Sequence, residues 1–555
     1  MFFREKKVTG HSYLQVVENR RENGRSRQRV VATLGRIDEL ERSGKLEGLL
    51  ESGARFCEAV LVLNAHRRGD AVTAASMRVG PTLVFERLWE QTGCGPVLQS
   101  LLGRREFASP LERAIFLTVL HRLMEPGSDR AAARWRTAYR IRGTEEVALH
   151  HAYRAMAWLG EPLPRAEQSG RTPFAPRCTK DKVEEELFAR RRELFSSLDL
   201  VFFDTTSIYF EGAGGQTIGR RGKSKDHRPD LPQMVVGLVL DQQGRPLCCE
   251  LWPGNTADVA TLVPVVERLR KRFGIGRVCI VADRGMISEE TIAAVEQRGW
   301  AYILGARMRS WHEVRDQVLS RPGRYHEVVP PRTKAKDPSP LKVKQVCVGE
   351  HRYVVCFNVE QARKDAADRE AIVAGLERQL RRGDRSLVGN KGFRRFVAVQ
   401  GAGFTIDEAK IRTEARYDGK WVLRTNTDWD ATEVALRYKQ LWMVEDLFRQ
   451  SKSLLETRPI WHQRDATIRG HVFCSFLALV LRKELLDRLE ASGHGEVEWA
   501  DVIRDLDRLE ETEIDHQGKR FIVRTESIGV AGIVCQAAGV ALPPTLRLAP
   551  SASPT

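Results

Sequence analysis

The sequence lacks the marks of a secreted or membrane-spanning protein. None of its 10 cysteines forms a C-x-x-C pair, and several lie in apolar runs such as Pro246–Leu251. We therefore expect buried free thiols of a reducing compartment, not disulfides or zinc ligands. The first residues contain no signal-peptide core, and the longest apolar run, Val472–Leu481, is too short to span a bilayer. We expect a cytoplasmic protein without a membrane partner.

Two further features are absent, a metal-type histidine spacing and internal repeats, and positive charge is in excess. The 13 histidines show no H-x-x-x-H spacing, and the chain has no internal repeats. Its 555 residues are enough for several domains. The net charge is +16 and the pI about 9.5. A surplus that large favours a polyanionic partner, usually nucleic acid; a merely soluble basic protein is the alternative.

The periodicity of apolar residues and the turn signals divide the chain into six segments. One of these segments, residues 46–195, contains no recognisable recognition-helix motif. A helical scaffold is therefore the alternative to a DNA-binding role for this segment. The predicted segments are a basic β-hairpin segment at 1–45 that turns at Asn23-Gly24, a mostly helical DNA-end-binding region at 46–195, the first part of an α/β core at 196–305, a β-rich insertion at 306–425, the second part of the core at 426–490, and a C-terminal region with a disordered tail at 491–555.

Two aspartates follow apolar, strand-like runs in the first part of the core. Leu200–Phe203 leads to Asp204, and Val278–Ala282 leads to Asp283. The other predicted core elements are strands at Met234–Leu240, Pro246–Trp252 and Trp300–Leu304, and two helices capped by Asp258 and Ser288. The resulting order, strand-strand-strand-helix-strand-helix-strand, is that of an RNase H-like α/β fold. The next core element of such a fold is a helix with an acidic residue.

The expected helix runs from Thr432 to about Leu455 and carries Glu445. Helical positions turn by about 100° per residue, which places a ring hydroxyl, a carboxylate and two cations along one face. A structural amphipathic helix would show an apolar stripe there; a solvated charged face is the alternative. The face consists of Tyr438, Leu441, Glu445, Arg449 and Lys452.

Two strand-end aspartates and one helical glutamate are the ligands that two-metal phosphoryl transfer requires. Neighbouring strands lie about 4.8 Å apart, so Asp204 and Asp283 should lie side by side, and the helix can bring in Glu445. Oxygen-only ligation suits two Mg²⁺ or Mn²⁺ ions. One ion would activate the attacking water or 3′-hydroxyl, and the other would stabilise the leaving oxygen. We predict these three residues as the catalytic and metal-binding residues of an enzyme that cuts and joins DNA.

Other residues are candidates for DNA contacts. Gly219–Ser224 is similar to a P-loop, but Thr217 stands where the first glycine belongs and the segment joins two strands. We interpret it as a phosphate-contacting loop, with a solvated loop as the alternative. Trp421 could stack on an extruded base or lie in the core. The basic residues of the loop are Arg220, Arg221, Lys223 and Lys225.

The segment around Glu445 resembles a known family. Its pattern Tyr438-x2-x-x3-Glu445-x6-Lys452 is similar to the Y-x2-R-x3-E-x6-K motif of DDE insertion-sequence transposases, a branch of the retroviral-integrase superfamily. The start of the chain and Arg469–Leu479 are similar to such transposases too. The resemblance implies a metal-binding triad of Asp204, Asp283 and Glu445 and a β-rich insertion before the glutamate. It also implies a homodimer on double-stranded DNA and a hairpin intermediate.

The sequence departs from this motif at Leu441, where the family has an arginine that holds the DNA-end phosphate together with the lysine. Arg449 is the predicted substitute, and Lys439 is a weaker one. The expected function is binding of terminal inverted repeats, DNA cleavage and strand transfer into target DNA at the nucleoid. The alternatives are a catalytically silent, transposase-derived DNA-binding protein and an RNase H-like nuclease without strand transfer.

Overall fold

The computed structural model separates the chain into two compact units. Unit 1 comprises Met1–Pro81, Ala138–Arg140 and Val497–Thr555, and unit 2 comprises Thr82–Thr137 and Ile141–Glu496. The residues described are 2–8, 10–22, 25–54, 72–103, 110–169, 171, 176–191, 200–275, 278–329, 340–381, 395–400, 403–516 and 519–549.

Unit 1 contains two small antiparallel sheets. The first has the order β1-β2-β3, with β1 at Phe2–Val8, β2 at His11–Glu22 and β3 at Arg25–Arg36. The two predicted N-terminal strands are thus confirmed, and their turn at Asn23-Gly24 lies outside the described residues. The helices of unit 1 are α1 (Ile37–Arg42), α2 (Lys45–Ala54), α18 (Trp499–Asp507) and α19 (Ala531–Ala537).

The second sheet of unit 1 joins segments from opposite ends of the sequence. Its order is β18-β17-β16-β4, and Glu510 of β16 pairs with Arg78 of β4. The sequence pattern predicts β17 but not its three neighbours, because such short strands are defined by distant partners. The predicted disordered tail lies largely outside the described residues. The strands are β4 (Val72–Arg78), β16 (Glu510–His516), β17 (Lys519–Arg524) and β18 (Leu546–Leu548).

Unit 2 is a mixed α/β structure around one nine-stranded sheet. The sheet order is β10-β11-β12-β15-β9-β8-β5-β6-β7. Strands β5, β8 and β9 are parallel, and β5, β6 and β7 are antiparallel neighbours. These five strands have the order and directions expected of an RNase H-like core. Their bounds are β5 at Leu200–Tyr209, β6 at Gln233–Leu240, β7 at Pro246–Pro253, β8 at Cys279–Ala282 and β9 at Ala301–Gly305.

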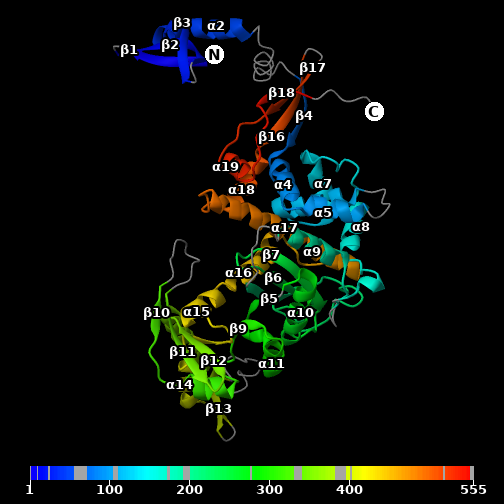
Figure 1. Ribbon diagram of the computed structural model, residues 1–555, viewed down its shortest axis with the longest axis vertical. Coiled ribbons are helices and arrows are strands. Elements are labelled where there is room, and N and C mark those ends of the chain that lie inside the picture. Colours follow the sequence, from blue (N-terminus) through cyan, green and yellow to red (C-terminus); the bar gives the residue numbers. More distant parts are fainter. Residues whose placement is uncertain are drawn as a thin grey trace. The chain divides into compact units, whose positions relative to one another are not determined.

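The strands after β9 extend the same sheet. β15 (Lys420–Thr425) pairs with β9, and Figure 1 shows β10, β11 and β12 beyond it. This part also contains a long helix, α12, where the charged stretch at 363–382 predicts a helix. Its remaining elements are the π-helix η6 (Glu313–Val318), β10 (His326–Val328), β11 (Leu341–Val348), β12 (His351–Phe357), α12 (Val359–Leu380), β13 (Val397–Gln400), β14 (Gly403–Ile406) and α14 (Glu408–Ala415).

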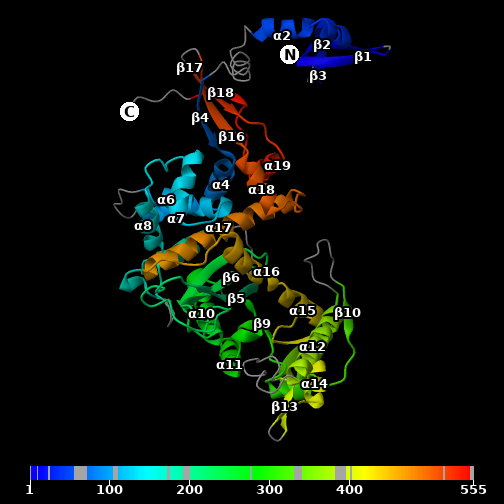
Figure 2. The ribbon, with the colours of Figure 1, turned by 180° about the vertical axis from the view of Figure 1, so that it is seen from behind.

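Helices cover both faces of the core strands. Side chains of α10 (Leu262–Phe273) and α11 (Glu289–Gln297) pack on one face, where Val265 and Ile292 join Val201 and Ile280 in a buried cluster. On the other face lies α17 (Asp465–Ala491), as both ribbon views show (Figures 1 and 2). No helix in the described part of the chain is both long and apolar enough to cross a membrane.

Two glycines let α17 approach α8 closely. A Cβ atom on Gly470 would lie 1.9 Å from the carbonyl oxygen of Met156, and one on Gly160 would lie 2.0 Å from that of Ala466. Only glycine fits backbones at that distance. The other helices of this region are α4 (Gly80–Gln91), α5 (Cys94–Leu102), α6 (Leu111–Met124), α7 (Asp129–Trp135), α8 (Leu149–Leu159) and α9 (Thr179–Arg191).

A buried charge network joins α9 to the sheet and to α10. The Glu184 carboxylate lies 2.6 Å from Arg272 Nη2 and 3.3 Å from Lys180 Nζ, and it accepts the backbone N–H of Cys249 at 3.0 Å. Its side chain has no exposed surface. Three buried cations and three buried carboxylates balance in this network, and Arg272 also pairs with the partly exposed Glu185 at 2.7 Å. The members are Lys180, Asp181, Glu184, Glu250, Arg268 and Arg272.

Glu184→Gln should destabilise unit 2. The substitution keeps the shape of the side chain but leaves Lys180 and Arg272 with excess positive charge in a buried place, which typically costs about 3–5 kcal/mol. The midpoint of urea unfolding measures the effect. The matched control is Glu267→Gln, which breaks the exposed pair with Arg298 and should change stability by less than about 1 kcal/mol. Equal effects of the two variants would contradict a stabilising role of the network.

Candidate active site

The register between β5 and β8 brings Asp204 next to Asp283. The two strands are parallel, and their last pair is Phe203 with Ala282. Asp204 and Asp283 follow this pair directly, on neighbouring strands. Asp283 is the first residue after β8, as predicted.

Asp204, by contrast, is not at a strand end. β5 continues to Tyr209 because it remains paired with β6, where Asp204 lies opposite Leu238. The prediction of a strand end was wrong because a long antiparallel partner keeps β5 extended after its parallel partner β8 has stopped. The aspartate therefore lies at the point where pairing with β8 ends.

Glu445 comes from a helical segment that is interrupted, not continuous. α15 (Ala431–Lys439) ends one turn before α16 (Trp442–Arg449), and the π-helix η8 (Gln450–Leu454) follows. Between the helices the backbone bonds run from residue i to i−3, as in Leu441 N–H to Tyr438 O. The single helical face predicted from Tyr438 to Lys452 is therefore wrong, because a tight turn and a π-segment change the angle between successive residues.

The aspartate pair and the helical segment meet at one place. The Tyr438 hydroxyl donates to Asp283 Oδ1 at 3.1 Å, which ties α15 to the end of β8. Asp283, Tyr438 and Glu445 line one pocket of about 580 Å³. Trp421 lines the same pocket, and Lys439 Nζ lies 5.2 Å from the centre of its ring. The structure therefore brings Asp283, Tyr438, Glu445 and Trp421 to one pocket, whereas Asp204 does not line it.

Burial and neighbouring negative charges raise the pKa values of Asp204, Glu445 and Tyr438. Burial, with added repulsion from Asp283 and Glu445, raises the pKa of Asp204 from 3.8 to about 7, although Lys225 opposes the shift. Burial and the Asp283 charge also raise the pKa of Glu445. Burial and Asp283 hold the pKa of the Tyr438 hydroxyl well above its ordinary value. The Asp283 charge thus contributes to raising the pKa of both Asp204 and Glu445, as a neighbouring carboxylate does.

Lys225 is held beside Asp204 by two partners. Its ammonium donates to the Thr205 carbonyl at 2.7 Å and to Thr205 Oγ1 at 2.9 Å, and lies 3.2 Å from Asp258 Oδ2. Thr205 Oγ1 in turn donates to Asp258 Oδ1 at 2.8 Å. The sequence predicts that Asp258 caps a helix. This prediction is wrong, because the Asp258 carboxylate is bound to Lys225 and Thr205.

The next residue of this loop contacts the predicted phosphate-binding lysine. Lys452 Nζ donates to Asp226 Oδ1 at 2.7 Å, and Arg458 Nη1 lies 3.2 Å from the same oxygen. The Lys452 side chain is 12% exposed and that of Asp226 5%. Lys225 and Asp226 thus link the loop to β5 on one side and to η8 on the other.

Arg449 points to solvent. Its side chain is 69% exposed and forms an i,i+3 pair with Asp446 at 3.2 Å. Its charge partly opposes the rise in the pKa of Glu445. Leu441, at the position of the family arginine, is buried. The structure therefore leaves the Arg449 guanidinium accessible.

A second pocket of about 700 Å³ has a strongly basic lining that includes Lys223 and Lys225. Its other cationic residues, Arg284, Arg307 and Arg309, are not predicted from the sequence. Arg220 and Arg221 are exposed on the same loop, and Arg220 donates to the carbonyl of Gly219 at 2.9 Å. They do not line either pocket.

Asp226 and Asp258 are further residues of this site that the sequence pattern did not single out. Asp226 is an acidic residue within the basic run from Arg220 to Arg228, and such a reversal of sign is a usable signal of an internal ion pair. Asp258 resembles an ordinary helix cap in sequence, so no signal was available for it.

The donor set fits hard divalent cations. Asp204, Asp283 and Glu445 offer oxygen atoms only, and burial together with the Asp283 charge raises the pKa values of Asp204 and Glu445. Oxygen donors suit Mg²⁺ or Mn²⁺. Among the described residues, the histidine, cysteine and acidic ligand atoms that all lie within 4.8 Å of one another form a different group, considered below.

Comparisons with known proteins match most of the chain. Residues 3–66 match a family profile described as the N-terminal domain of IS1634 family transposases, and residues 196–481 match one described as a transposase DDE domain. No curated protein matches the chain.

Solved structures are similar only at low identity. One is the cryo-EM structure of a piggyBac transposase synaptic complex with hairpin DNA, at 10% identity and a TM-score of 0.37, covering 77% of this chain and 79% of that chain. Another is the Mos1 transposase paired-end complex with the left transposon end, at 15% identity and a TM-score of 0.14, covering 36% of this chain and 60% of that chain.

The raised pKa of Asp204 predicts a pH-dependent stability of the metal-free protein. Between pH 3.8 and about 7 the group is protonated when folded and ionised when unfolded. Stability is therefore lost as the pH rises through this window, and the effect is constant above it. Asp204→Asn removes the titration. In EDTA, its gain in Tm over the wild type should be smallest near pH 4 and grow until about pH 7.

Asp230→Asn is the control for this measurement, because Asp230 is exposed and pairs with Arg228. Its pKa is lowered, so it cannot give a gain that grows with pH. A gain for Asp204→Asn that is the same at every pH would contradict the burial and repulsion described for this site.

Proposed function

Because the chain belongs to the family of transposases with a DDE domain, we propose that it is an insertion-sequence transposase that binds the terminal inverted repeats of its element and cuts and joins DNA. The observation that carries this proposal is the adjacency of Asp204 and Asp283 in the β5–β8 register, with Glu445 lining the same pocket as Asp283. The partners are the repeat ends and the target DNA, and a homodimer in the DNA complex and action at the cytoplasmic nucleoid belong to the same proposal.

The three carboxylates are proposed to hold two Mg²⁺ or Mn²⁺ ions. When bound, these ions would activate the attacking water or 3′-hydroxyl and stabilise the leaving oxygen. Tyr438 orients Asp283 through its hydroxyl. Lys225, anchored by Asp258 and Thr205, holds positive charge beside Asp204 and favours its ionised, ligating form.

The basic residues around the carboxylates are proposed to hold the DNA backbone. Lys452, kept in place by Asp226, and the exposed Arg449 would contact the phosphate at the transposon end. Lys223, Lys225, Arg220 and Arg221 would contact neighbouring phosphates. Trp421 borders the carboxylate pocket, where its ring is within reach of a base extruded from the duplex. The catalytically silent alternative has no observation in its favour, since all three carboxylates are present.

Asp204→Asn should abolish cleavage and leave binding of the repeat ends nearly unchanged. Loss of a residue that hydrogen-bonds to a metal ligand already lowers metal affinity or activity by about 10- to 100-fold. Loss of a direct ligand should lower them further. Binding depends on cationic contacts to phosphates and should persist. A gel shift and a nicking assay in Mg²⁺ on the same repeat-end DNA separate the two effects. Asp230→Asn is the matched control and should cut normally; undiminished cleavage by Asp204→Asn would refute the assignment.

Arg449→Ala should weaken strand transfer by about 10- to 100-fold, the value of one charge-assisted hydrogen-bonded contact of about 1.5–3 kcal/mol. The control is Arg504→Ala in α18, because Arg504 forms the same kind of i,i+3 pair with Asp501 and is 54% exposed. Its loss should leave transfer unchanged. Equal transfer by both variants would mean that Lys452 binds the end phosphate without help from Arg449.

A further inference from the structure

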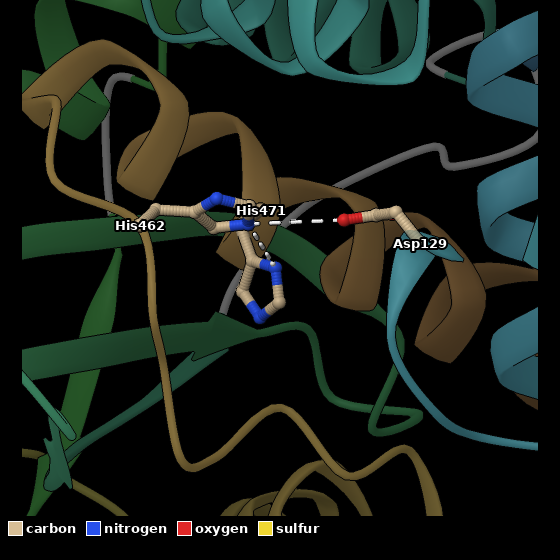
Figure 3. A group of neighbouring side chains, drawn as sticks. All are labelled: Asp129, His462 and His471. Carbon is tan, nitrogen blue, oxygen red and sulfur yellow. Dashed lines mark hydrogen bonds and ion pairs between the residues drawn. The ribbon is translucent and has the colours of Figure 1, made fainter. Parts of the chain in front are cut away.

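A second cluster of metal-ligand side chains lies away from the carboxylate pocket. Asp129 begins α7, His471 lies in α17, and His462 lies in the segment between η8 and α17 (Figure 3). His462 Nε2 is 3.2 Å from His471 Nδ1 and 3.8 Å from Asp129 Oδ2. One ligand atom from each residue lies within 4.8 Å of the others.

These separations match a tetrahedral zinc site. Zinc binds histidine nitrogen and carboxylate oxygen at about 2.0–2.2 Å, so two ligand atoms of a tetrahedron lie about 3.3–3.5 Å apart. The two measured separations bracket this value. A set of two histidines and one aspartate leaves the fourth position for water. The side chains of His462 and Asp129 are 16% and 9% exposed, so an ion has a route of entry.

The surroundings orient His471 as a ligand. Its Nε2 lies 3.2 Å from the carbonyl oxygen of Thr457, and a carbonyl can only accept, so Nε2 carries the hydrogen. The lone pair is then on Nδ1, which points into the cluster. Ligating histidines usually make such a bond with the opposite nitrogen, which fixes the tautomer. Burial also lowers the pKa of both rings, which keeps them neutral.

Arg122 competes with an ion for this lone pair. Its Nη2 lies 2.9 Å from His471 Nδ1, and the guanidinium also donates to the His471 carbonyl and to Ser475 Oγ, each at 2.5 Å. Metal binding would break the first of these bonds and retain the other two. Asp129 supplies a negative charge to the cluster. Arg122 therefore weakens the site without closing it.

We propose that Asp129, His462 and His471 form a structural site for a zinc-like divalent cation. Such an ion would join α7 to α17 and to the segment at 455–464. That segment follows Lys452 and is attached to the end of β5 through Ile460, whose N–H donates to the carbonyl of Tyr209 at 3.4 Å. The cation would hold the chain between the end of η8 and the start of α17.

Zinc titration of the full-length protein tests the proposal. Protein stripped with EDTA is titrated with Zn²⁺ by calorimetry in excess Mg²⁺, which saturates the oxygen-only carboxylate site. We expect one tight site per chain and a rise in Tm with Zn²⁺. His462→Ala should weaken binding by more than about 100-fold, beyond the 10- to 100-fold typical of outer partners. Asp129→Asn, which keeps the size of the side chain, should also weaken it.

His494→Ala is the matched control, since His494 is a partly exposed histidine outside the cluster, and it should bind like the wild type. Co²⁺ in place of Zn²⁺ identifies the ligands: tetrahedral nitrogen and oxygen ligation gives visible d–d bands without the intense near-ultraviolet absorption of thiolate ligation. Wild-type protein that binds no zinc, zinc affinity unchanged in both His462→Ala and Asp129→Asn, or a thiolate spectrum would each overturn the proposal.

Discussion

The parallel pairing of β5 with β8 is the constraint on which the rest of the site depends. It sets Asp204 and Asp283 on neighbouring strands and so brings two like charges together where water is scarce. Burial, with repulsion from the neighbouring carboxylates, raises the pKa of Asp204 even though Lys225 opposes the shift, so the ionised form of Asp204 is unfavourable here. The proposed pair of divalent ions would stabilise that form.

The residues around the two aspartates form ion pairs of their own. In the loop between β5 and β6, Lys225 is bound to Asp258 beside Asp204, and Asp226 is bound to Lys452 of η8. One dipeptide therefore connects the strand that carries the first aspartate with the helical segment that follows Glu445. The buried network around Glu184 also connects elements through paired charges, since it fixes α9 against β7 and α10.

Much of the fold could be predicted from local patterns. The apolar runs at β5 to β9 and the cap at Ser288 identify the core elements, because each signal lies within a few residues. The break between α15 and α16 could not be predicted, since the dihedral angles there remain helical and only the bonding pattern changes. The contacts of Asp258 and the cluster of Asp129 with His462 could not be predicted for another reason, which is that their partners are distant in sequence. Strand β4 could not be predicted for the same reason, because it pairs with β16.

The central claim is that Asp204, Asp283 and Glu445 surround the same divalent ions, and iron-mediated cleavage of the polypeptide tests it most directly. Fe²⁺ bound in place of Mg²⁺ produces radicals that cut the nearest backbone. The account predicts three sets of fragments, with ends near residues 204, 283 and 445, all suppressed by excess Mg²⁺. Cuts near only one of these residues, or cuts that Mg²⁺ does not suppress, would contradict a shared metal centre.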